Sequence, residues 1–87
     1  MSEDELKNIE KYAGVFYSPK QIAVLMEMDA AEMDIAMSDD KSEIYRAYWK
    51  GFYENEYSIR LSNIELAVAG SVPANALVLK YIQEARS

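Results

Sequence analysis

The strongest constraint on the fold is the stretch 18–37, SPKQIAVLMEMDAAEMDIAM, which carries two helix start signals in close succession. Ser18 and Gln21 form a Ser-x-x-Gln capping box, with a proline between them at the first helical position. Asp29 and Glu32 repeat the pattern as Asp-x-x-Glu. These signals predict two short helices joined by a turn of about two or three residues, the shape of a helix-turn-helix.

Apolar residues at helical spacing give each of these two helices an inward face. The residues expected there are Ile22, Leu25 and Met26 in the first helix and Met33, Ala36 and Met37 in the second. The second helix, which reads base edges in DNA-binding proteins of this shape, carries Glu32 and Asp34 and no basic residue. A purely structural pair of helices therefore stays open as the alternative.

The rest of the sequence is helical in character, since only two prolines and three glycines interrupt it. A first helix is expected over about 3–13, starting after Ser2 and ending at Gly14, with Leu6, Ile9 and Ala13 facing the core. Residues 38–40 form a linker and cap. A long helix over about 41–69 and a last helix over 74–85, which Ser71 caps, are expected to fold back as a hairpin.

These elements predict an all-α fold: a single helical domain over 1–87, divided into a helix-turn-helix-like part (1–38) and a helical hairpin (41–87) that oligomerises. In the long helix, Gly51 is expected to be a weak point that costs about 1 kcal/mol against alanine. Its apolar rows change phase from Tyr45, Trp49 and Phe52 to Tyr57, Leu61, Ile64 and Val68, and the second row has coiled-coil spacing. The predicted oligomer interface comprises Trp49, Phe52, Tyr57, Leu61 and Ile64.

Composition excludes several classes of site. The chain has no cysteine and no histidine, so it lacks the residues for a disulfide, a thiolate or imidazole metal site, and a histidine base. Paired carboxylates such as Asp39 and Asp40 are expected to be solvated, and we expect no cofactor and no enzymatic activity. There is no apolar run long enough to cross a membrane, and the charged start, MSEDELKNIEK, predicts no signal peptide. A cytoplasmic protein is expected.

The net charge of −6 opposes binding to nucleic acid unless the positive charges gather on one face. The candidate DNA-binding residues are Lys20, Lys41, Arg46 and Lys50. Arg46 and Lys50 lie four residues apart among aromatic residues, a combination that stacks bases and holds phosphates. The alternative is that their long aliphatic stems cover aromatic rings of the core.

Three segments give the chain a resemblance to small terminase subunits of tailed phages and prophages. They are YSPKQIAVLMEMD (17–29), EIYRAYWKGFYENEYSIRLSNIELAVAG (43–70) and AGSVPANALVLKYI (69–82). The resemblance implies a non-enzymatic DNA-packaging protein in a bacterial host that binds DNA, assembles as a homo-oligomer and works with a large terminase subunit. The acidic second helix of the pair departs from that pattern.

A second hypothesis comes from the same residues. A small acidic adaptor could bind a protein partner through the Tyr- and Trp-rich helix face without binding DNA. The two hypotheses differ in the expected position of Lys20, Lys41, Arg46 and Lys50, which favour DNA if they converge and the adaptor if they scatter.

Overall fold

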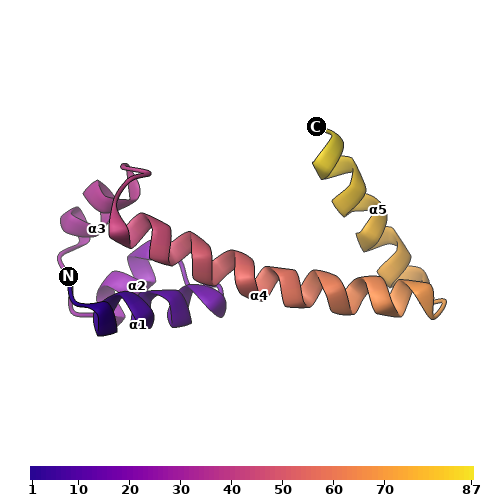
Figure 1. Ribbon diagram of the computed structural model, residues 1–87, viewed down its shortest axis with the longest axis horizontal. Coiled ribbons are helices and arrows are strands. Elements are labelled where there is room, and N and C mark those ends of the chain that lie inside the picture. The colour runs from indigo at the N-terminus through magenta and orange to yellow at the C-terminus, as the bar shows by residue number, and fades with distance from the viewer. The chain divides into compact units, whose positions relative to one another are not determined.

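The computed structural model describes all 87 residues and contains five helices and no strand (Figure 1). The helices are α1 (Glu3–Gly14), α2 (Pro19–Leu25), α3 (Ala30–Met37), α4 (Glu43–Val68) and α5 (Val72–Arg86). The predicted all-α fold is confirmed.

The chain forms two compact units, Met1–Asn55 and Glu56–Ser87, which are called here the N-terminal unit and the C-terminal unit. The boundary falls inside α4 and not at the linker over 38–40, where the sequence predicted it. The N-terminal unit thus contains α1, α2, α3 and the first half of α4. The C-terminal unit contains the second half of α4 and α5.

Helix starts agree with the capping residues predicted from the sequence. The predicted Ser18 capping box is formed, with Gln21 N donating to Ser18 Oγ at 3.2 Å, and Ser2 starts α1 through a second box, in which Glu5 N donates to Ser2 Oγ at 3.2 Å. The hydroxyl of Ser71 likewise accepts from the backbone of α5. These bonds satisfy backbone N–H groups that have no partner inside the helix.

Two predicted starts are wrong in detail. Asp29 does cap α3, accepting from Ala31 N at 2.9 Å, but Glu32 does not complete the expected box. The α2–α3 turn has four residues, 26–29, rather than two or three.

The long helix begins at Glu43 rather than at Lys41. The hydroxyl of Ser42 accepts a hydrogen bond from the backbone of its first turn, so Lys41 lies in the preceding turn.

The core of the N-terminal unit lies between α1, α2, α3 and the start of α4. Its buried apolar residues are Ile9, Ala13, Ile22, Ala23, Met33, Ile44, Ala47 and Tyr48. The predicted inward positions Ile9, Ile22 and Met33 are confirmed, whereas Leu25 is exposed, because the stripe of α2 turns inward through Ala23 instead.

The aromatic side chains of the first half of α4 are buried to different degrees. Tyr48 is the buried aromatic, 5% exposed, and its hydroxyl donates to the carbonyl oxygen of Tyr17 at 2.9 Å. Tyr45, Trp49 and Phe52 lie beside that face and are half-buried. The inward face follows Ile44, Tyr48 and Gly51 because this row points at α1 and α2.

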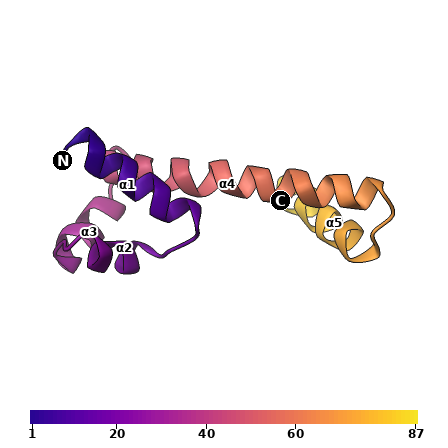
Figure 2. The same ribbon diagram turned by 90° about the horizontal axis from the view of Figure 1, so that it is seen from below.

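Gly51 is a point of close contact rather than a weakness. In both views α1 runs alongside the first half of α4 (Figures 1 and 2). A Cβ on Gly51 would collide with the backbone of Glu10, so only glycine allows the two helices to approach this closely. One turn further, the side-chain amide of Asn55 donates to the carbonyl oxygen of Gly14 at 2.7 Å, which satisfies the end of α1.

The C-terminal unit is a helix hairpin made of the second half of α4 and α5, shorter than the hairpin predicted over 41–87. Gly70, with φ +102°, turns the chain between α4 and α5. Asn63 Nδ2 donates to the Tyr81 hydroxyl at 2.8 Å, and Arg60 pairs with Glu84 at 3.0 Å. Because these bonded partners run in opposite order along the two helices, α5 folds back against α4.

Candidate nucleic-acid and assembly surfaces

Two of the four predicted DNA-binding residues come together. Arg46 and Lys50 line one hollow between α1 and α4, together with Glu10 and Glu43. Lys50 Nζ lies 3.5 Å from Glu10 Oε1. Lys50 is therefore engaged by an acidic side chain of its own unit.

The other two candidates lie elsewhere. Lys20 is exposed in the first turn of α2, and Lys41 is exposed in the turn before α4. Neither lines the hollow that contains Arg46 and Lys50. The predicted DNA-binding residues therefore belong to at least three segments of the N-terminal unit.

Two further lysines at this crossing were not predicted from the sequence. Lys7 and Lys11 of α1 line an adjoining hollow together with Glu54 and Gly51. Glu10 lines both hollows. The signal was present as basic residues at i and i+4 on α1, but only the packing of α1 on α4 shows which basic residues of α4 they accompany.

Acidic charge dominates the N-terminal unit as a whole. It holds twelve of the acidic residues and six of the basic ones, a net charge of −6, whereas the C-terminal unit has three of each. Glu32 and Asp34 are exposed on α3. The second helix of the helix-turn-helix pair therefore presents negative charge to solvent.

The aromatic side chains of α4 form a connected cluster in the N-terminal unit. Trp49 stacks on Tyr53 with 5.4 Å between ring centroids, and Phe52 meets Phe16 edge to face at 5.0 Å. Trp49 and Phe52, predicted to form an oligomer interface, pack in part against the core of their own unit. Tyr53 remains 57% exposed.

The C-terminal unit buries very little of its apolar surface. Ala74 is its only buried residue. The large apolar residues it exposes are Tyr57, Ile59, Leu61, Ile64, Leu66, Val68, Val72, Leu77, Leu79 and Ile82. Two paired helices that leave this much apolar surface in water lack a core of their own.

The predicted coiled-coil row remains exposed. Tyr57, Leu61, Ile64 and Val68 are 66%, 41%, 41% and 85% exposed. The residues of α4 nearest α5 belong to a different row, which includes Arg60 and Asn63. The row at coiled-coil spacing is therefore free to meet another helix.

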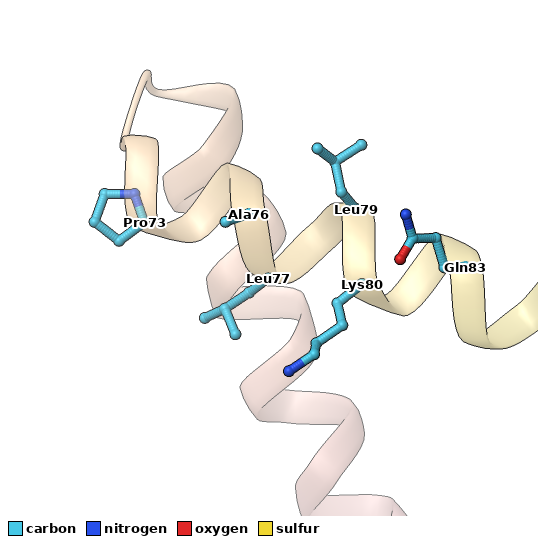
Figure 3. Close-up of a pocket in the computed structure, with 6 residues that line it drawn as sticks. All are labelled: Pro73, Ala76, Leu77, Leu79, Lys80 and Gln83. Atoms are coloured by element: carbon cyan, nitrogen blue, oxygen red, sulfur yellow. The ribbon is translucent and has the colours of Figure 1, made fainter.

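A second apolar feature lies on α5. A shallow hollow there is lined by Pro73, Ala76, Leu77, Leu79, Lys80 and Gln83, all from the same helix. Figure 3 shows the side chains of Leu77 and Leu79 extending to different sides of α5. The exposed apolar surface of the C-terminal unit therefore includes more than one side of this helix.

Arg60 is the polar centre of the hairpin and was not singled out for this role from the sequence. It pairs with Glu56 at 3.2 Å and with Glu84 at 3.0 Å, and its guanidinium lies 4.1 Å from the ring centroid of Tyr81. The hydrogen bond to Glu84 raises the pKa of Arg60 above its ordinary value. Only the spacing of Glu56 and Arg60 could have been read from the sequence.

No group of three or more acidic side chains gathers in a way that could hold a metal ion. No helix has both the length and the apolar character needed to cross a membrane. Comparisons with protein-family models, curated proteins and solved structures find no match to this chain.

Proposed function

We propose that this chain is a non-enzymatic small subunit of the phage or prophage DNA-packaging kind, acting in the cytoplasm of a bacterial host. It self-assembles through its C-terminal unit and binds DNA weakly through each N-terminal unit. A large terminase subunit is the further partner that the resemblance implies.

The observation that carries the proposal is the exposed apolar surface of the C-terminal unit. A hairpin with one buried residue and a row at coiled-coil spacing gains its stability by meeting other helices. Its balanced charge supports association with identical copies, since no net repulsion opposes it.

The N-terminal unit supports the DNA-binding part of the proposal more weakly. The pair α2–α3 consists of two short helices joined by a four-residue turn, as in a helix-turn-helix, and Arg46 and Lys50 lie together between α1 and α4. A net charge of −6 makes each contact weak. Assembly compensates, because many linked weak sites on one DNA raise the overall affinity.

Two measurements test the proposal. Light scattering is expected to give a solution mass several times the 9.9 kDa of the chain. Duplex DNA is expected to bind at low salt and to dissociate as salt rises, because phosphate contacts release counterions. A monomer without DNA affinity even at low salt contradicts the proposal.

The competing function is an acidic adaptor that binds a protein through the Tyr- and Trp-rich face of α4. The exposed ring of Tyr53, stacked on Trp49, favours it, as does the acidic surface of α3. This function predicts no DNA binding at any salt concentration. It also predicts that Trp49→Ala abolishes partner binding.

A further inference from the structure

The α1–α4 crossing brings together four basic residues that the sequence separates. Lys7 and Lys11 lie on α1, and Arg46 and Lys50 lie on α4. Each pair is spaced i and i+4, so each lies along one side of its helix. The two pairs line adjoining hollows that share Glu10.

Glycine at position 51 creates this arrangement. A Cβ there would meet the backbone of Glu10, so the close approach of the two helices depends on its absence. Four of the six basic residues of the N-terminal unit line these two hollows. The hollows are also lined by three of the twelve acidic residues of the unit, Glu10, Glu43 and Glu54, so this surface is locally much less acidic than the rest of the unit.

One acidic residue of this surface forms an ion pair with one of its basic residues. Glu10 pairs with Lys50 at 3.5 Å, and the Lys50 side chain is still 61% exposed. The ion pairs described above do not include Lys7, Lys11 or Arg46, and the Lys11 ammonium lies 5.7 Å from the ring centroid of Tyr12. The side chains of Lys7, Lys11 and Arg46 are exposed, whereas Lys50 is engaged by a carboxylate.

We propose that this α1–α4 face, and not α3, is the contact surface for the phosphate backbone of duplex DNA, with Glu10 competing with phosphate for Lys50. The inference rests on the proposed function, which it deepens by naming the surface and the chemistry. Contact with phosphates alone carries no direct base readout, so binding through this face is independent of base sequence. It explains how a chain with an acidic second helix in its helix-turn-helix pair binds DNA.

The first test measures DNA affinity against salt for variants that each remove one charge. Lys7→Gln and Arg46→Gln each remove one phosphate partner per subunit, and each is expected to make the slope of log K against log salt shallower by about 0.9 for every subunit that contacts the DNA. Lys80→Gln, a matched removal of one positive charge in the C-terminal unit, is expected to leave the slope unchanged.

The second test removes the competing carboxylate. Glu10→Gln is expected to steepen the slope by about 0.9, and to tighten binding roughly two- to fivefold at low salt, for every subunit that contacts the DNA. Glu32→Gln on α3 makes the same charge change away from both hollows and is expected to have a smaller effect and an unchanged slope.

The outcomes separate this inference from the proposed function. If Glu32→Gln steepens the slope and Glu10→Gln does not, DNA contacts α3 and the inference is overturned while DNA binding stands. If Lys7→Gln and Arg46→Gln bind like the unsubstituted protein, the inference is likewise overturned. If the unsubstituted protein binds no DNA at low salt, both the proposed function and this inference are overturned. Circular dichroism of each variant checks that it remains folded.

Discussion

At the scale of single residues, the sequence and the structure assign opposite roles to Gly51. Propensity alone predicts that alanine stabilises α4 at this position. The structure places the Gly51 Cα against the backbone of Glu10, which cannot move aside as the end of a flexible side chain could. A sequence without its fold cannot show this, because the helix that meets position 51 lies about forty residues away in the chain.

Gly51→Ala is therefore expected to destabilise the N-terminal unit by about 1–3 kcal/mol, because it forces α1 away from α4. Urea denaturation followed by circular dichroism measures the change. Ser62→Ala is the matched control on the exposed surface of the same helix, and a change within about 0.5 kcal/mol is expected there. A stabilised Gly51→Ala protein would contradict the close crossing of α1 and α4.

Tyr48 gives the protein a dependence on alkaline pH. Burial raises the pKa of its hydroxyl above the ordinary value of 10.0. The unfolded chain therefore loses this proton at lower pH than the folded chain does. The stability that Tyr48 contributes is fully present below about pH 10 and is lost as the pH rises through its folded-state pKa.

Tyr48→Phe is expected to remove this part of the alkaline destabilisation. It also costs about 1 kcal/mol at neutral pH, since phenylalanine cannot donate a hydrogen bond to the carbonyl oxygen of Tyr17. Thermal denaturation between pH 7 and pH 11 measures both effects. Tyr53→Phe, at an exposed ring, should retain the alkaline slope of the unsubstituted protein.

At the scale of elements, helix starts could be predicted well because capping is local. Ser2, Ser18 and Ser71 each bond to the backbone a few residues ahead, so the sequence contains both partners. The start of α4 was predicted two residues too early, because the polar residues 38–40 were assigned as its cap and Ser42 has that role instead. Which helix face becomes buried depends on neighbours distant in sequence, so Leu25 was assigned to the wrong face and the burial of Tyr48 was not predicted.

A candidate site could be predicted from the sequence where it lies on one helix, and could not where two helices form it. The exposed row at Tyr57, Leu61 and Ile64 could be predicted from spacing alone, because it lies on one helix. The grouping of Lys7 with Arg46 could not, since it arises from the packing of α1 on α4. The hairpin contacts of Arg60 required the fold for the same reason.

Arg60 is expected to hold α5 against α4. Arg60→Met removes its pairs with Glu56 and Glu84 and its contact with the Tyr81 ring. Amide hydrogen exchange in α5 should become roughly two- to fivefold faster, as expected for partly exposed pairs. Arg86→Met, which removes an exposed charge at the end of α5, is the control and should leave exchange in the middle of α5 unchanged.

At the scale of the whole molecule, the row at coiled-coil spacing in the C-terminal unit predicts the assembly state. In heptad terms, Leu61 and Val68 occupy a positions, and Tyr57 and Ile64 occupy d positions. Leucine at a with isoleucine at d favours more than two helices. The assembly is therefore expected to exceed a dimer.

The double variant Leu61→Asp with Ile64→Asp is expected to lower the solution mass to the 9.9 kDa of one chain. Buried carboxylates without partners disfavour a helix-helix seam strongly. Light scattering measures the mass, and Ser62→Asp, outside the row, should leave it unchanged. An unchanged mass in the double variant would place the interface elsewhere, with the other exposed apolar residues of α4 and α5 as the candidates.

The position of Trp49 provides an optical probe of the N-terminal unit. Its ring nitrogen is buried without a hydrogen-bond partner, and it is the only tryptophan in the chain. Fluorescence excited at the indole band therefore reports on the N-terminal unit and on no other part of the chain, and the half-buried indole emits at a shorter wavelength than a fully exposed one does. Far-ultraviolet ellipticity reports on all five helices. If the two units unfold separately, the fluorescence and the ellipticity of a single sample will change at different temperatures.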